Sequence, residues 1–173
     1  MPRLPLSFFE RSADIVAQDL IGCVLCIKQR GRVEKLPITE VEAYMGPHDL
    51  ACHSSRGRTQ RTEVMYEKAG TLYIYLVYGM HHMLNIVTGP KEYPAAVLIR
   101  SVGEYQGPGK LTKKLKITRT HNKAVLGRQA GLWIESSTTP KPRVVRTPRI
   151  GVDYAKHWAK KKLRFLDPER VKK

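Results

Sequence analysis

The chain has 173 residues, 42% of them hydrophobic, and its 31 Lys and Arg against 15 Asp and Glu give a formal net charge of +16. This length predicts one domain with a single sizeable core. The charge favours a polyanionic partner, nucleic acid first, over a small neutral ligand. A membrane partner is disfavoured, because no run approaches the roughly 18 apolar residues that a spanning helix needs.

The three cysteines, Cys23, Cys26 and Cys52, are too few and odd in number for a disulfide framework. The chain starts without the long apolar core of a signal peptide. We therefore expect an intracellular protein, cytoplasmic or nucleoid-associated if bacterial. Cys23 and Cys26 form a Cys-x-x-Cys, but residues three apart on a strand face opposite sides, so we expect no metal site.

The beginning of the chain predicts a helix followed by a hairpin. Apolar residues recur at helical spacing over 13–20, and Gly22 ends the helix. Two strands, 23–28 and 33–41, flank the turn-forming residues 29–32. The second strand then runs on into a loop.

Glu40 and Glu42 stand near the end of that second strand, just before the loop at Gly46 and Pro47. Because they are two apart on a strand they share a face, and either carboxylate could orient a water molecule for attack on a carbon atom. The alternative is an exposed or salt-bridged strand residue.

Residues 54–62 carry Arg56, Arg58 and Arg61 among Ser, Gly, Thr and Gln. These are the small polar and cationic groups that contact phosphate oxygens, so the segment predicts a DNA-backbone loop. The alternative is a solvated basic turn.

Residues 72–77 alternate aromatic and aliphatic side chains at the two-residue period of a strand, after one or two helical turns at 63–68. Tyr75 could supply a stacking ring, and Tyr78 on the turn with Gly79 is placed as a wedge between stacked bases would be. The alternative is that these tyrosines are ordinary half-buried sheet residues.

Residues 83–87 predict the partner of that strand, and 94–102 predict a strand buried on both faces. Arg100 near its end needs an acidic or phosphate partner. A basic helix is predicted from Gly107 to about Ile117. It does not open on a P-loop, because Leu111 stands where Ser or Thr should be.

The last part of the chain predicts a strand at 132–135, a Pro-rich loop at 136–143, an extended piece at 144–152 and a final strand at 163–165. The basic tail from Lys156 is assigned only a general electrostatic role. The fold class we expect is mixed α/β: a single domain around a curved, mostly antiparallel β-sheet with flanking short helices.

An enzyme that acts on one base of a duplex must flip it out, and needs a wedge, a stacking pocket and a reactive group. The chain has a candidate for each. One carboxylate suffices if the leaving purine is N-alkylated, because such a base is already cationic and departs without protonation. The rival hypothesis is a non-catalytic RNA-binding protein, which leaves Glu42 without a task.

Several motifs in register resemble the alkyladenine (3-methyladenine) DNA glycosylase family over nearly the whole chain, from about Leu4 to Phe165. They are Glu42-Ala43-Tyr44-Met45-Gly46-Pro47, Asp49, Ala51, His53-Ser54, Gly57-Arg58-Thr59, Gly70-Thr71-Leu72-Tyr73-Ile74-Tyr75, Tyr78-Gly79-Met80, Leu84-Asn85, Ala96-Val97-Leu98-Ile99-Arg100 and Gly107-Pro108-Gly109-Lys110-Leu111.

The resemblance implies a monofunctional DNA glycosylase domain over 1–173 that flips out a damaged purine, hydrolyses its N-glycosidic bond and leaves an abasic site. Glu42 looks like the carboxylate that activates water, and takes preference over Glu40 by its motif. Arg100, the second implied catalytic residue, resembles one that supports the water and the phosphate near Glu42. The implied lesions are 3-methyladenine, 7-methylguanine, hypoxanthine and ethenoadenine.

The same resemblance implies the other site residues. Tyr44, His53 and Tyr75 look like the walls of the base pocket, with a main-chain NH near His53 reading the purine edge. Asn85 resembles the residue that crowds the exocyclic amino group of guanine, and Tyr78 looks like the intercalating wedge. Backbone contacts fall to Arg56, Arg58, Arg61 and Lys110. We expect double-stranded DNA with damaged purines as the partner, a monomer, and no cofactor or metal.

The chain departs from the family pattern at three places. A helical insertion commonly follows the strand of Arg100, whereas here 101–106 leads directly to the next helix, so this is a shortened member. Gln60 and Thr62 replace the usual Pro and Asn. His81 and His82 stand where aromatic or apolar residues are more common, and either touch phosphate or form a solvent-exposed pair.

Overall fold

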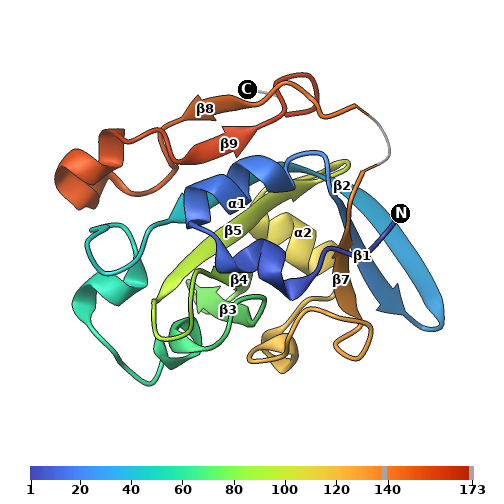
Figure 1. Cartoon of the computed structure of the whole chain (residues 1–173), viewed down its shortest axis with the longest axis horizontal. Helices are drawn as coiled ribbons and strands as arrows, with labels where there is room; N and C mark the ends of the chain where they lie inside the picture. Colours follow the sequence, from blue (N-terminus) through green and yellow to red (C-terminus); the bar gives the residue numbers. More distant parts are fainter. Residues whose placement is uncertain (138–139, 172–173) are drawn as a thin grey trace.

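The computed structural model describes residues 1–137 and 140–171 (Figure 1). Part of the predicted Pro-rich loop, 138–139, therefore lies outside the described residues. The helices are α1 (Ala13–Leu20), α2 (Pro108–Lys114) and the 3-10 turns η1 (Leu6–Glu10), η2 (His53–Arg56), η3 (Glu63–Tyr66), η4 (Arg119–His121) and η5 (Asp153–Lys160). The strands are β1 (Val24–Gln29), β2 (Arg32–Tyr44), β3 (Leu72–Val77), β4 (His81–Thr88), β5 (Ala95–Val102), β6 (Tyr105–Gln106), β7 (Leu132–Glu135), β8 (Val145–Thr147) and β9 (Arg164–Leu166).

The strands form one sheet whose main path runs β3-β4-β5-β2-β1-β7. β6 pairs with β5, and β9 joins β2 to β8. Every strand pair in the described part of the chain is antiparallel, and the sheet curls into a half-barrel with short helices packed on it (Figure 1). The predicted mixed α/β, single-domain class is therefore confirmed.

The predicted hairpin is β1 and β2, closed by a two-residue turn in which Arg30 and Gly31 take φ of 47° and 78°. Positive φ at both central residues is the geometry that matches the twist of paired strands. β2 is longer than expected, since it continues to Tyr44. Glu42 thus lies inside a paired strand, opposite Leu98 of β5.

Strand alternation separates the sheet into two faces of different chemistry. One face is apolar and packs with α1 and α2 in the main core, through residues such as Ile74, Ile86, Val97, Val41 and Ile27. Their neighbours along the same strands point the other way, so the polar and aromatic side chains of β2 to β5 collect on the opposite face. That face carries the candidate site.

The structure also differs from the prediction at other elements. α2 ends at Lys114 rather than near Ile117, because Lys116 adopts φ of 51°, which a continuing helix cannot contain. β4 begins at His81, two residues before the predicted start. The segment η5 was not predicted, and its backbone leaves the helical region at Lys156, where φ is 52°.

Cys23 packs in the main core, whereas Cys26 packs with Val24 and Trp133 in a separate cluster. The two thiols therefore face opposite sides of the strand, as the spacing predicts.

Among the helices within the described ranges, none combines the length and the apolar character of a membrane span.

Candidate active site

A row of four directly paired residues crosses the functional face of the sheet. Tyr73 of β3 pairs with Asn85 of β4, Asn85 with Leu98 of β5, and Leu98 with Glu42 of β2. Paired residues on adjacent antiparallel strands project to the same side. The register therefore brings residues from positions 42 to 98 of the chain into one line.

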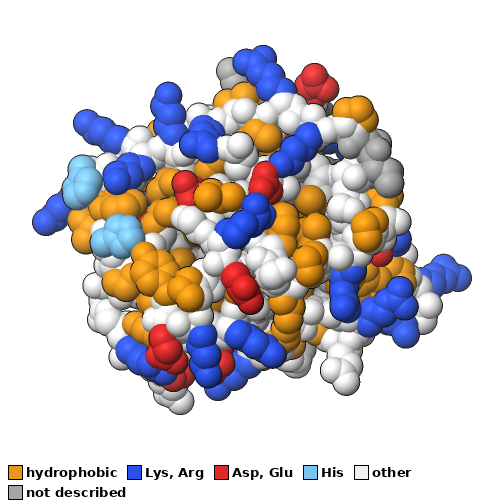
Figure 2. Space-filling model, viewed as in Figure 1, with side chains coloured by type: hydrophobic (Ala, Val, Ile, Leu, Met, Phe, Trp, Pro, Cys, Tyr) orange, Lys and Arg blue, Asp and Glu red, His pale blue; other side chains and the backbone are white. Residues whose placement is uncertain are grey.

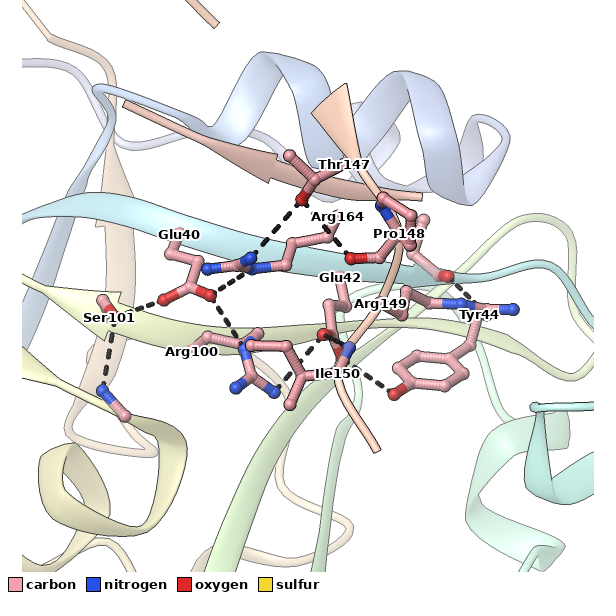
Figure 3. Close-up of polar contacts among 12 residues, drawn as sticks. Glu40, Glu42, Tyr44, Arg100, Ser101, Thr147, Pro148, Arg149, Ile150 and Arg164 are labelled. Carbon is pink, nitrogen blue, oxygen red and sulfur yellow. Dashed lines mark hydrogen bonds and ion pairs between the residues drawn. The ribbon is translucent and has the colours of Figure 1, made fainter. Parts of the chain in front are cut away.

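Glu42 is fully buried, and both of its carboxylate oxygens have partners (Figure 3). Oε2 accepts a hydrogen bond of 2.9 Å from the Tyr44 hydroxyl, and Oε1 accepts one of 2.8 Å from the main-chain NH of Ile150. Arg100 Nη1 lies 3.4 Å from Oε1. A carboxylate has about four acceptor positions, so these three contacts leave it able to accept a further hydrogen bond.

Arg100 lies between Glu42 and Glu40, and so shows that the two carboxylates share a face as predicted (Figure 3). Its Nε donates to Glu40 Oε1 at 3.0 Å. Burial by itself lowers the pKa of Arg100, but the nearby Glu42 and Glu40 carboxylates outweigh it and raise that pKa. Arg100 is thus a permanent cation beside Glu42.

Glu40 plays a different part. It is held by Ser101 Oγ at 2.6 Å and Arg164 Nε at 2.6 Å in addition to Arg100. Burial raises the pKa of Glu40, and these donors lower it further than burial raises it. Two cations and a hydroxyl thus hold Glu40 in a structural ion-pair network.

A cleft of about 480 Å³ opens beside Glu42. Glu42 does not line it, but Tyr44, Arg100 and Ile150, which contact its carboxylate, all do. The cleft is lined by Tyr44, Ala51, His53, Arg61, Tyr75, Leu76, Val77, Tyr78, Met83, Leu98, Arg100, Pro108, Ile150, Gly151, Val152 and Tyr154. The predicted walls Tyr44, His53 and Tyr75 are therefore in one cavity with the predicted wedge.

A smaller pocket of about 20 Å³ adjoins the cleft and is lined by all four predicted base-pocket residues, Tyr44, His53, Tyr75 and Asn85. The His53 and Tyr75 rings meet edge-on with centroids 4.6 Å apart. The orientation of the Asn85 side chain is fixed by a hydrogen bond of 3.2 Å from its Nδ2 to the carbonyl oxygen of Tyr73. The pocket is too small for a purine without movement, so the wider cleft is where a base can enter.

His53 is a neutral group in this pocket. Its Nδ1 lies 2.9 Å from the Tyr73 hydroxyl. Burial, and secondly the charges of Arg61 and Arg56, lower the pKa of His53 to about 4. Sequence reasoning missed Tyr73 as a pocket residue, although its position two before Tyr75 on the same strand is the signal that places both on one face.

The return segment, which we define as residues 147–152, closes the back of the site. Arg149 is completely buried and binds Asp49 in a bidentate pair, with Nη1 to Oδ2 at 2.6 Å and Nη2 to Oδ1 at 2.8 Å. The Arg149 guanidinium also lies 4.8 Å from the centroid of the Tyr44 ring. The sequence marks Arg149 only as a cation in an extended piece, so its role was missed.

Tyr78 stands at the tip of the β3–β4 hairpin and is 90% exposed. It adopts φ of 52°, a conformation that is strained for a bulky residue, and Gly79 follows at 68°. Met80 beside it is also exposed. The hairpin therefore presents an apolar, projecting tip at the edge of the cleft, which Tyr78 also lines.

The predicted backbone-contact residues occupy different environments. Arg58 is paired with Glu63 and Glu92 and stacks on Tyr66, so it would exchange a carboxylate to reach a phosphate. Arg56 and Arg61 line a common hollow, and Lys110 is exposed in the first turn of α2. Figure 2 shows Lys and Arg spread over one face of the molecule.

The two histidines after the wedge also differ. His81 is exposed and its ring packs close to Gly109 of α2, whereas His82 is half-buried, so they do not form the solvent-exposed pair considered above.

Within 1–137 and 140–171, no group of three or more His, Cys, Asp or Glu side chains is placed to hold a metal ion.

Comparison with known proteins gives a consistent set of relatives. The family model described as "Methylpurine-DNA glycosylase (MPG)" matches residues 7–106 and 103–170. The two matched ranges overlap at 103–106, in the short connection before α2.

Curated relatives match across most of the chain. A protein of Myxococcus xanthus is 43% identical over 98% of this chain and 93% of its own length. One of Legionella pneumophila (strain Corby) is 43% identical over 95% and 94%, and one of Sodalis glossinidius is 47% identical over 86% and 89%. Each bears the name "Putative 3-methyladenine DNA glycosylase".

We expect Arg149→Met to lower the free energy of unfolding by about 3 to 5 kcal/mol, because it leaves the Asp49 carboxylate buried without its cation. Arg11→Met, which removes a partly exposed pair with Asp19, is the matched control and should cost under about 1 kcal/mol. Urea unfolding measures both. Equal losses of unfolding free energy in the two variants would show that the buried pair contributes no more to stability than the partly exposed pair.

We expect His53 to make the protein acid-sensitive. Because its pKa is about 4 in the folded state and near 6.5 when unfolded, the stability from the neutral ring is complete above pH 6.5 and is lost as pH falls towards 4. The His53→Asn variant should therefore lose less stability than wild type between pH 7 and pH 4, by on the order of 2 kcal/mol. Thermal unfolding across this pH range gives the comparison, and parallel curves would contradict it.

Proposed function

The chain belongs to the methylpurine-DNA glycosylase family, and on that premise we propose that it flips a damaged purine into the cleft and hydrolyses its bond to deoxyribose with water activated by Glu42. As a member of that family it is a DNA glycosylase, a hydrolase of N-glycosyl bonds that acts on DNA containing damaged bases. Membership of this family supports the enzyme hypothesis and rejects the alternative of a non-catalytic RNA-binding protein.

The observation that carries the proposal is that a buried carboxylate contacts two residues that line an aromatic cleft. Glu42 is bound by Tyr44 and lies beside Arg100, and both of these line the cavity that also holds His53 and Tyr75. A flipped nucleotide whose base stacks on these rings would bring the anomeric carbon of its deoxyribose towards the Glu42 end of the cleft. Stacking on aromatic faces contributes about 1 to 3 kcal/mol per base, which offsets the cost of unstacking.

In the proposed reaction a water molecule hydrogen-bonds to Glu42 and attacks the anomeric carbon as the bond to the purine breaks. The purine leaves with the bonding electron pair, so an N-alkylated cationic base departs as a neutral molecule. A neutral base such as hypoxanthine departs as an anion and takes up a proton from solvent. Glu42 accepts the proton of the water and later releases it to solvent, which leaves an abasic deoxyribose. Arg100, a permanent cation whose Nη1 lies 3.4 Å from Glu42 Oε1, would orient the carboxylate.

Recognition of the base would combine stacking and exclusion. Tyr44, Tyr75 and neutral His53 offer ring contacts, and a main-chain NH near His53 would read the purine edge. Asn85 is held by the sheet backbone and would crowd the exocyclic amino group of guanine. The proposed substrates are 3-methyladenine, 7-methylguanine, hypoxanthine and ethenoadenine.

Tyr78 would fill the stack that the flipped base leaves, because it projects from the hairpin tip and borders the cleft. Arg56, Arg61 and Lys110 are exposed cations that would contact phosphates, and Arg58 would shape the loop of Arg56 and Arg61. We propose that residues 1–173 act as one glycosylase domain and as a monomer.

We expect Glu42→Gln to reduce excision by about 100-fold or more while binding to lesion-containing duplex is retained, because the amide cannot accept a proton from water. Hypoxanthine duplexes treated with protein and then alkali report excision. Glu40→Gln is the control, since Glu40 serves the ion-pair network, and it should keep most activity. Full activity of Glu42→Gln would remove Glu42 as the base.

We expect Tyr78→Ser to slow excision from duplex DNA by about tenfold and excision from single strands by much less, because a wedge matters only where a stack has to be filled. The measurement compares single-turnover rates on the same lesion in both contexts. Equal losses on duplex and single strand would count against the wedge.

A further inference from the structure

Arg61 has a position that a backbone contact does not explain. Its guanidinium carbon lies 4.9 Å from the centroid of the Tyr75 ring, the ring that the proposed function uses to stack the flipped base. Tyr75 is also packed against His53 and Tyr73, with centroids 4.6 Å and 5.1 Å away. Arg61 is therefore a cation placed directly on the aromatic pocket.

Three hollows meet at this cation. Arg61 lines the cleft of about 480 Å³, a hollow of about 460 Å³ along the outer edge of β3, and a hollow of about 380 Å³ that includes Arg56 and Tyr154. Tyr75 lines the first two of these, and His53 the first and third. Any base that reaches the pocket through the cleft comes close to the Arg61 charge.

That charge is not neutralised by a carboxylate. Arg58, three residues earlier, is paired with Glu63 and Glu92, whereas no carboxylate among the described residues forms an ion pair with Arg61. Arg61 is exposed, so its field is screened by solvent and salt without being cancelled.

The lesions of the proposed function differ in the same property. A purine alkylated at N7 or N3 while bound to deoxyribose is a planar cation, like a guanidinium, and is drawn to the electron-rich face of a tyrosine ring. Hypoxanthine is planar and neutral. Two cations on one ring repel each other, whereas a neutral base stacks without that cost.

We propose that Arg61 is a specificity-determining residue that disfavours cationic purines relative to neutral ones in this pocket. The inference rests on the proposed function, because it assumes that the base stacks at Tyr75. Removal of the charge raises the preference for cationic bases by about three- to tenfold, which corresponds to one unit charge a few ångströms away in a partly screened site.

The experiment compares single-turnover excision of 7-methylguanine and hypoxanthine, each in the same duplex, by wild type and Arg61→Gln. The expected result is a three- to tenfold rise in the ratio of the cationic to the neutral rate, smaller at high salt. A ratio unchanged by the substitution overturns the proposal, even if both rates fall, because loss of a phosphate contact weakens both substrates equally.

Two variants separate charge and position. Arg61→Lys keeps the charge, and its ratio should stay within about twofold of wild type. Arg56→Gln removes a cation from the same loop that does not stack on Tyr75, and its ratio should also stay near wild type. A change in either variant as large as that of Arg61→Gln overturns the proposal. Thermal unfolding verifies that all variants are folded.

Binding measurements keep this test independent of catalysis. Dissociation constants for the same two duplexes, measured with Glu42→Gln and with Glu42→Gln combined with Arg61→Gln, should show the same shift in ratio. If wild type excises neither base, the proposed hydrolysis fails, while the ratio of dissociation constants still decides whether Arg61 selects against cations. Equal ratios in the two variants overturn the role of Arg61.

Discussion

The structure depends on the neutralisation of three buried carboxylates by arginines that come from distant parts of the chain. Glu42 and Asp49 are fully buried and Glu40 nearly so, and an unpaired charge in such a place costs several kcal/mol. Arg100 from β5, Arg149 from the return segment and Arg164 from β9 supply the partners. The pairs of Arg149 and Arg164 tie the last part of the chain to β2 and to the loop that follows it, and the main-chain NH of Ile150 then donates to Glu42.

Because side chains alternate along a strand, the same strands supply both the residues of the core and the residues of the candidate site. Each of β2 to β5 gives one set of side chains to the apolar core under α1 and α2 and the other set to the cleft. Tyr73, Asn85, Leu98 and Glu42 therefore hold their spacing through backbone hydrogen bonds instead of flexible loops. A site built on paired strands is positioned more precisely than one on loops.

The residues that we propose contact DNA lie at the rim of this face. Tyr78 on its hairpin tip and the loop that carries Arg56 and Arg61 border the cleft but contribute little to the core. The short connection between β5 and α2 contains the small strand β6, which pairs back onto β5.

The sequence by itself determined the antiparallel strands, the first hairpin and the shared face of Glu40 and Glu42, because two-residue periodicity and turn chemistry are local properties. Motifs in register also predicted that Tyr44, His53, Tyr75 and Asn85 meet, and they do line one pocket. Only the tertiary structure decided that Arg149 reaches Asp49, that Tyr73 reaches His53 and that Arg61 stacks on Tyr75. Such contacts join residues far apart in the chain, and no local pattern specifies which buried charge or ring a given arginine will find.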